Sequence, residues 1–144
     1  MRMQSRLLLS VSLLSLILIA QSAQAGTVRR CKFDGTVNPA TFTYSITGGP
    51  ASTTVVVDAT IGNAGAIMLN PEPIPDITTD GSGNGSASFQ VQCIDVTKGD
   101  WVFVTFDPTP APGGQSCGVI VICKSAGAVP QYKNKVGNTT IVTK

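Results

Sequence analysis

The sequence contains no histidine and only one glutamate, Glu72, which sits between two prolines. Without an imidazole, Ser-His-Asp and Cys-His catalysis, histidine-based zinc hydrolysis and imidazole proton shuttling are all excluded. The aspartates lie mostly in stretches rich in Gly, Pro and Asn, where their ordinary role is to form turns. We therefore expect a protein that is not an enzyme and that needs no cofactor.

Charge is also scarce, because only 12% of the residues are charged, with 10 Lys and Arg against 8 Asp and Glu. Two of the basic residues lie in the first 25 positions, so residues 26–144 carry no formal net charge. The one local basic cluster is Arg29, Arg30 and Lys32, which we interpret as the solvated charges of an edge strand. Such a chain has little electric field with which to collect a polyanion, so no nucleic-acid partner is expected.

Residues 1–25 have the pattern of a secretory signal peptide. A short basic region ends at Arg6, an apolar stretch covers residues 7–20, and Ala23-Gln24-Ala25 forms a small-x-small exit. The apolar stretch is shorter than the about 20 residues of a membrane span. The sequence thus predicts a signal peptide over 1–25 and a single domain over 26–144. We expect the domain to be secreted, periplasmic or on the cell surface, with no membrane insertion once the signal is removed.

The rest of the chain alternates apolar and polar residues with a period of two, which predicts half-buried strands over 41–47, 54–61 and 86–93. Two further runs, 101–106 and 117–123, are apolar at almost every position, so we expect central strands covered on both faces. Gly/Pro/Asn clusters at 48–50, 62–65, 70–76, 80–85 and 108–114 separate these runs, and no amphipathic helix is found. The pattern predicts an all-β, antiparallel sandwich or barrel with a closing strand at 139–143.

Four cysteines, Cys31, Cys93, Cys117 and Cys123, favour two disulfides in an exported protein. Their spacing contains no C-x-x-C pair, so no metal site is expected there. If 117–123 is one extended strand, its two cysteines lie about 20 Å apart, well beyond the about 7 Å that a disulfide spans. We therefore favour separate bridges from Cys117 and Cys123 to Cys31 and Cys93. The alternative joins Cys31 to Cys93 and closes the other two in a loop that bends at Gly118.

Asp80, Ser82 and Asn84 place oxygen atoms at alternate positions, with Gly85 at the sixth position, as in a calcium-binding hand loop. The twelfth position of that loop is a bidentate acid, whereas this chain has Val91 there, so calcium would bind weakly. We favour a turn that leads into a strand, because Asp, Asn and Gly readily supply its backbone angles.

Residues 77–106, ITTDGSGNGSASFQVQCIDVTKGDWVFVTF, resemble the middle of secreted bacterial immunoglobulin-like modules. In those modules a Thr-Asp-x-x-Gly turn precedes a strand, and a short connection with Gly leads into an aromatic-led strand. Residues 79–91 are also similar to the corresponding turn and strand of the antibiotic-carrying chromoproteins of the neocarzinostatin type. The resemblance implies an immunoglobulin-like fold, and it makes a small-molecule carrier one candidate function.

Large aromatic side chains are the remaining candidates for a binding site: Tyr44, Trp101, Phe103 and Tyr132. Such residues either line a ligand or carbohydrate face or fill the core. We single out Trp101 and Tyr132, and we expect Tyr132 to be exposed on a loop. Asn84 and Asn138 begin glycosylation motifs, which matter only in a eukaryotic source.

The sequence as a whole predicts a secreted, non-catalytic immunoglobulin-like β-sandwich with two disulfides that binds a protein or glycan partner. One alternative is a structural subunit of a surface assembly such as a fimbria or coat, in which residues 26–33 serve as a free arm for strand addition. Another is a neocarzinostatin-like carrier, which requires a deep apolar cleft. Self-association distinguishes the first alternative, and a chromophore bound on purification distinguishes the second.

Overall fold

The computed structural model describes residues 26–62, 65–107 and 116–144, which form ten strands and no helix. The predicted signal peptide and the predicted turn at 108–114 lie outside these residues. The strands are β1 (Val28–Asp34), β2 (Ala40–Thr47), β3 (Thr54–Ile61), β4 (Ile67–Asn70), β5 (Ile77–Thr78), β6 (Gly85–Cys93), β7 (Thr97–Asp107), β8 (Cys117–Cys123), β9 (Gln131–Val136) and β10 (Thr139–Val142). No helix in the described part of the chain is long and apolar enough to cross a membrane.

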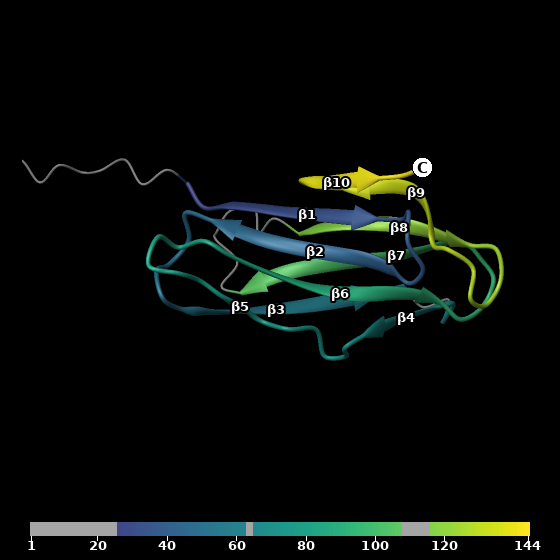
Figure 1. Cartoon of the computed structure of the whole chain (residues 1–144), viewed down its shortest axis with the longest axis horizontal. Helices are drawn as coiled ribbons and strands as arrows, with labels where there is room; N and C mark the ends of the chain where they lie inside the picture. Colours follow the sequence, from purple (N-terminus) through teal and green to yellow (C-terminus); the bar gives the residue numbers. More distant parts are fainter. Residues whose placement is uncertain (1–25, 63–64, 108–115) are drawn as a thin grey trace, which may run out of the picture.

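The strands form two five-stranded sheets that pack face to face as an elongated sandwich (Figure 1). Sheet one has the order β10-β1-β2-β6-β4, and sheet two has the order β5-β3-β7-β8-β9. Every neighbouring pair is antiparallel except β1 and β10, which run parallel. The predicted all-β antiparallel sandwich is therefore confirmed.

The strand order is consistent with an immunoglobulin-like arrangement. With the two-residue β5 set aside, β1-β2-β6-β4 facing β3-β7-β8 reproduces the ABED and CFG sheets of a constant-type immunoglobulin domain. Two features extend that arrangement, because β9 is added at the edge of sheet two and β10 at the edge of sheet one. The chain passes between these two edges in the short connection at Gly137 and Asn138, so the sheets are joined along one side.

The core lies between the sheets and is built by the period-two alternation that the sequence shows. In β2, residues 40, 42, 44 and 46 are buried and the residues between them are partly exposed. Four aromatic side chains meet at the centre: Phe42 stacks on Phe89 with ring centroids 5.0 Å apart, and Tyr44 contacts both Phe89 and Phe106. Burial of such side chains stabilises the fold by about 1.5–3 kcal/mol each.

Two disulfides, Cys31–Cys117 and Cys93–Cys123, cross the interior and join the sheets. Both bridges start from β8, one at each end of the strand, and reach β1 and β6 of the opposite sheet. The favoured pairing is thus confirmed, because an extended β8 holds its two cysteines too far apart to join each other. Disulfides of this kind are typical of proteins that leave the reducing cytosol.

The N-terminal strand differs from its predicted role. β1 pairs with β2 on one side and with β10 on the other, so it is an interior strand rather than an edge strand or a free arm. The alternation turns Arg29 inward, where it is only 7% exposed and its guanidinium lies 5.6 Å from the ring centroid of Phe106. Burial lowers the pKa of Arg29 from its usual value. Only Arg30 and Lys32 of the cluster are surface charges.

Candidate functional site

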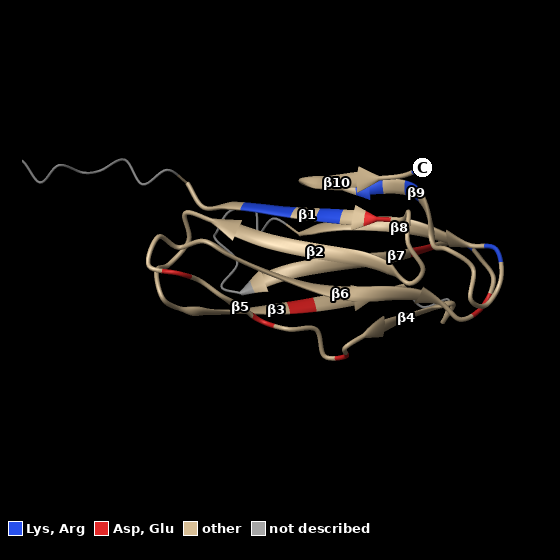
Figure 2. Ribbon diagram, viewed as in Figure 1, with Lys and Arg blue, Asp and Glu red and all other residues tan. Residues whose placement is uncertain are grey.

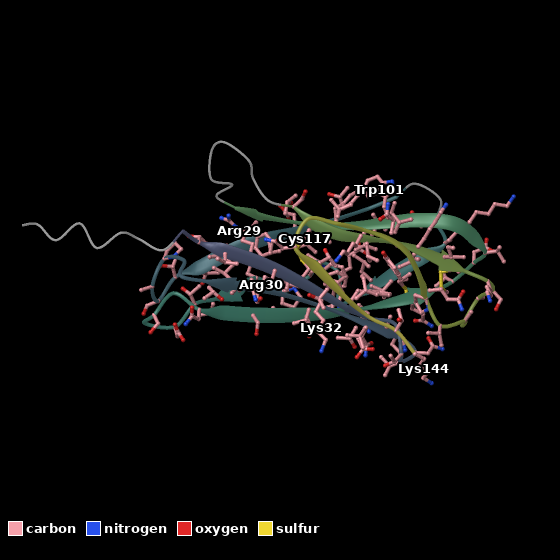
Figure 3. All side chains as sticks on the ribbon, turned by 90° about the horizontal axis from the view of Figure 1, so that it is seen from above. Arg29, Arg30, Lys32, Trp101, Cys117 and Lys144 are labelled. Carbon is pink, nitrogen blue, oxygen red and sulfur yellow. A yellow bond between two sulfur atoms is a disulfide. The ribbon has the colours of Figure 1, made fainter. Side chains whose placement is uncertain are left out.

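On the outer face of sheet two, the central strands β7 and β8 carry four large apolar side chains that lie outside the sandwich core. In β7 and β8 the alternate residues point inward and belong to the core, whereas the residues between them point outward and are partly exposed. We call the four outward side chains the outer platform: Trp101, Phe103, Ile120 and Ile122. Figure 3 places Trp101 and Lys32 on opposite outer faces of the sandwich.

Stacked rings form the centre of the outer platform. The ring centroids of Trp101 and Phe103 are 4.9 Å apart, and the ring planes differ by 29°. Phe103 lies over Gly118 of the neighbouring strand, where a Cβ atom would come within 2.2 Å of Phe103 Cδ1. The absence of a side chain at position 118 therefore leaves room for the Phe103 ring, which stacks on the Trp101 ring.

Polar side chains surround the outer platform on the adjacent strands. Thr60 of β3 lies opposite Phe103, and Asn134 of β9 lies opposite Ile120, and both are exposed. Lys133 also reaches this face, where its ammonium group donates a long hydrogen bond of 3.4 Å to the carbonyl of Lys98. An apolar surface bordered by hydroxyl, amide and ammonium groups is suited to binding a partner with both apolar and polar parts.

The prediction that β7 and β8 are covered on both faces is wrong. Both strands are central within sheet two, but the sandwich has only two layers, so only one face of each sheet is covered. The apolar residues of the second face cover one another instead, which is why they are partly rather than fully buried. Ile120 and Ile122 were not among the expected site residues.

A buried carboxylate lies beneath one end of the outer platform. Asp100 is 1% exposed, and its Oδ1 accepts the N–H of Trp101 at 3.0 Å. Its Oδ2 has no hydrogen-bond partner among the described residues. Asp100 lies so close to Gly62 that a Cβ atom at position 62 would be 1.9 Å from Asp100 Oδ1. This close packing fixes the backbone at Trp101, the first residue of the outer platform.

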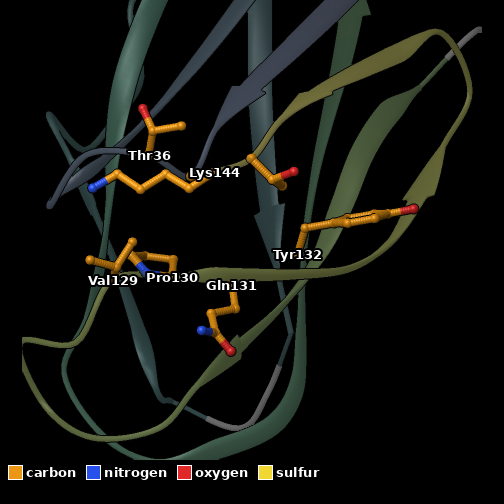
Figure 4. Close-up of a pocket in the computed structure, with 8 residues that line it drawn as sticks. Thr36, Val129, Pro130, Gln131, Tyr132 and Lys144 are labelled. Atoms are coloured by element: carbon orange, nitrogen blue, oxygen red, sulfur yellow. The ribbon is translucent and has the colours of Figure 1, made fainter.

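Tyr132 lies elsewhere, on β9 rather than on the expected loop, and it is 38% exposed. It borders a pocket of about 390 Å³ together with residues of the segments at 35–36, 129–131 and 143–144. The ring of Tyr132 and the side chain of Lys144 extend in opposite directions, and Gln131 points away from both (Figure 4). The polar groups of this pocket do not converge, and β8 separates Tyr132 from Trp101.

Two hydroxyl groups donate hydrogen bonds within the protein, one beside Tyr132 and one in the core. Thr36, in the Tyr132 pocket, donates its hydroxyl to Asp34 Oδ1 at 2.6 Å, and its N–H donates to the same oxygen. These two bonds lower the pKa of Asp34. In the core, the hydroxyl of Tyr44 donates to the carbonyl of Pro75, and burial, together with the nearby Asp76, raises its pKa to about 12.

The loop considered for calcium forms a hydrogen-bonded turn. Asp80 Oδ1 accepts the N–H groups of Ser82 and Asn84, at 2.8 and 2.9 Å, and Asn84 Oδ1 accepts the N–H of Gly48. Gly83 has a φ of 78° and packs against Gly49, so the turn needs glycine there. The side-chain oxygens of Asp80 and Asn84 thus act as acceptors for the backbone, as expected for a turn that leads into β6.

Comparison of the chain with models of known protein families, with curated proteins and with solved structures gives no significant match. With all four cysteines in disulfides and no histidine in the sequence, neither a free thiol nor an imidazole can serve as a nucleophile or general base.

Proposed function

We propose that this chain is an exported, non-catalytic immunoglobulin-like domain that binds a protein or glycan partner through the outer face of sheet two. The observation that carries the proposal is the outer platform, in which Trp101 stacks on Phe103 beside two isoleucines outside the core. Contiguous apolar side chains on the surface of a small domain are typical of interaction sites.

The physical chemistry of the outer platform favours contact with a flat, amphipathic partner. Trp and Phe offer large contact areas at a small cost in side-chain entropy, and the indole N–H supplies a hydrogen-bond donor. The rings lie on a sheet and are supported by Gly118 and Ile120, so little ordering is needed when a partner binds. A pyranose ring or an apolar protein surface fits this description, and the neighbouring Thr60 and Asn134 supply hydroxyl and amide groups.

Export is supported by the two disulfides, which persist in oxidising compartments, and by the signal-peptide pattern of residues 1–25. A non-catalytic role is supported by the residue types available. The single glutamate, Glu72, is exposed in the segment between β4 and β5, and no histidine or free thiol is available to act as a base or a nucleophile.

Trp101 is the only tryptophan in the chain, so its fluorescence reports directly on the outer platform. We would titrate the protein with soluble oligosaccharides from microbial and host surfaces and screen it on a glycan and protein array. A ligand of the platform should shift and saturate the emission of Trp101. The F103A variant should weaken binding by roughly tenfold or more, since hot-spot aromatic residues contribute about 2 kcal/mol or more.

The matched control is Y132A, which removes an exposed aromatic residue of the edge strand β9, away from the outer platform. Binding should survive in Y132A and be lost in W101A. A ligand whose affinity depends on Tyr132 and not on Trp101 would contradict the proposed site. An array that yields no ligand for the folded, disulfide-bonded protein would contradict the proposed function.

A further inference from the structure

Most exposed charged side chains of the sandwich form two groups, one basic and one acidic, at opposite edges of sheet two and on nearby strands (Figure 2). We define the basic edge as Arg30 and Lys32 of β1 with Lys133 and Lys135 of β9, all exposed. We define the acidic edge as Asp58 of β3 with Glu72 and Asp76 of the segment between β4 and β5, also exposed. β1 additionally carries Asp34 at its far end, beyond Lys32.

Each charged edge also offers unpaired backbone. β9 is the last strand of sheet two, and residues 131–135 are exposed. At the other end of the sheet, β3 pairs with β5 only at Thr54 and Val55, so residues 56–61 have β7 as their only strand partner in the described chain. Asp76 Oδ1 accepts the N–H of Val57 at 3.0 Å, which leaves the edge of β3 open from residue 58 onward.

Grooves of similar size accompany the two edges. A groove of about 300 Å³ follows the open edge of β3, and it is lined by apolar side chains such as Leu69 and Ile74 with Asp58 and Glu72 among them. A groove of about 350 Å³ on the opposite side contains Arg30 and Lys135, and no acidic residue lines it. The two surfaces are thus complementary in charge, and both belong to the same molecule.

The directions of the strands allow these edges to meet. Because β3, β7, β8 and β9 are successively antiparallel, β3 and β9 run in opposite directions. A second copy can be shifted across sheet two, perpendicular to the strands and without rotation. Its β9 then lies beside β3 in antiparallel orientation, which is the more stable pairing. Lys133 of that copy, which reaches the outer face of sheet two, then lies on the same face as Asp58 across the new strand pair, and Lys135 lies on the other face.

We propose that the basic edge of one copy docks on the acidic edge of the next, adding β9 to the open edge of β3 and continuing sheet two between molecules. The occupant is a second copy because residues 26–144 carry no formal net charge, so copies do not repel one another. Two β9 strands placed edge to edge would instead oppose lysine to lysine, which disfavours a symmetric pair. A contact between two different edges does not close, so it produces an open row of subunits, as in the surface-assembly alternative, and the contact does not use the outer platform.

Sedimentation velocity of the purified, disulfide-bonded protein tests this contact. The average size should increase with protein concentration at low salt, and it should fall when roughly 0.5 M NaCl screens the charged edges. A single monomeric species at all concentrations and at low salt would overturn the proposal.

Charge reversals make the test specific to the two edges. K133E/K135E and D58K/E72K should each be monomeric, or should need at least about tenfold more protein to associate. An equimolar mixture of the two variants should associate again, because every contact then joins opposite charges. K98E/K124E, which changes the net charge as K133E/K135E does but lies off the basic edge, should associate like the wild type.

Retained association of K133E/K135E, or a mixture that stays monomeric while both variants are folded, would overturn the edge contact. Folding is checked by the disulfide mass and by thermal unfolding. The inference is independent of the outer platform, so W101A should associate like the wild type. Loss of association in W101A would place the contact on the outer face of sheet two and would also overturn the proposal.

Discussion

Tyr44 is the largest fully buried side chain among the described residues, and it carries a polar atom into an aromatic core. Its hydroxyl donates to the carbonyl of Pro75, in the irregular segment that links β4 to β5. The hydrogen bond offsets the cost of burying the hydroxyl, and it holds this proline-rich segment against the sandwich. The same segment supplies Asp76, which caps the edge of β3, so one tyrosine helps to position part of the acidic edge.

The Y44F variant should be less stable than the wild type by about 1 kcal/mol near neutral pH, because it lacks this hydrogen bond. The phenol has a pKa of about 12 in the folded state, against about 10 in the unfolded chain. Because the pKa of Tyr44 is higher in the folded than in the unfolded state, its neutral phenol stabilises the fold. This stabilisation is fully present below pH about 10 and is lost as the pH rises to about 12. The difference between the wild type and Y44F should therefore shrink above pH about 10.

Urea unfolding of both proteins between pH about 8 and about 11 measures this difference. The comparison cancels every contribution that the two proteins share. A difference in the free energy of unfolding that stays constant over this range would contradict the assignment.

At the scale of single strands, β8 joins the core to the surface. One face supplies the inward cysteines and valines, and the other supplies two residues of the outer platform. Gly118 is the position where the two roles meet, because it is buried under Phe103 and lies close to the carbonyl of Val102. A Cβ at this position would come within 2.4 Å of that carbonyl oxygen.

The G118A variant should be destabilised by about 1–3 kcal/mol, since either the Phe103 ring or the β7 backbone must move. Displacement of Phe103 should also change the emission of Trp101, which stacks on it. Thermal unfolding and fluorescence spectra measure the two effects. A suitable control is G81A in the exposed turn before β6, where no atom lies within 4 Å of the added Cβ and φ is not in the left-handed region. A fully native stability and spectrum in G118A would contradict this account.

Strands with a clear alternation could be predicted from the sequence to within a residue or two, as β2, β3 and β6 show, and β8 could be placed from its continuous apolar run. β9 could not, because QYKNKV is exposed on both faces and therefore carries no alternation. β4 and β5 were missed as well, because four and two residues are too short for a period to be visible. The interior position of β1 depends on β10, which pairs with it from the far end of the chain.

The outer platform could have been inferred from its sequence signal, although its residues were assigned to the wrong environment. Runs such as WVFVTF and CGVIVIC are apolar on both faces, whereas a two-layer sandwich has only one interior. One of the two apolar faces must therefore point outward. The sequence does not indicate which of the two faces points outward, because Trp101 and Val102, on opposite faces of β7, are equally plausible in a core.

At the scale of the whole molecule, the two disulfides connect the sheets at both ends of β8. They close chain segments of different length, with sequence separations of 86 for Cys31–Cys117 and 30 for Cys93–Cys123. In the chain-entropy treatment, these separations correspond to stabilisation by about 4.5 and about 3.5 kcal/mol.

Removal of the Cys31–Cys117 bridge in C31A/C117A should therefore cost about 1 kcal/mol more than removal of the other bridge in C93A/C123A. Both double variants replace buried cysteines by alanine, so the costs of the small cavities largely cancel in the comparison. Urea unfolding of the two variants and the wild type gives the three free energies. A larger loss in C93A/C123A would contradict the entropic explanation.

The position of these bridges also determines how the molecule transmits tension. If residues 26 and 144 are pulled apart, the load reaches Cys31, crosses to Cys117, follows β8 to Cys123 and continues into β9 and β10. The chain from residue 32 to residue 116 is bypassed, because the covalent route through β8 is far shorter. The groove beside β3 and the aromatic core lie within that unloaded segment, whereas the groove with Arg30 and Lys135 lies in the part that carries the load. In a protein exposed to flow or to a tethered partner, most of the sandwich would thus remain folded while the strands at its joined side carry the force.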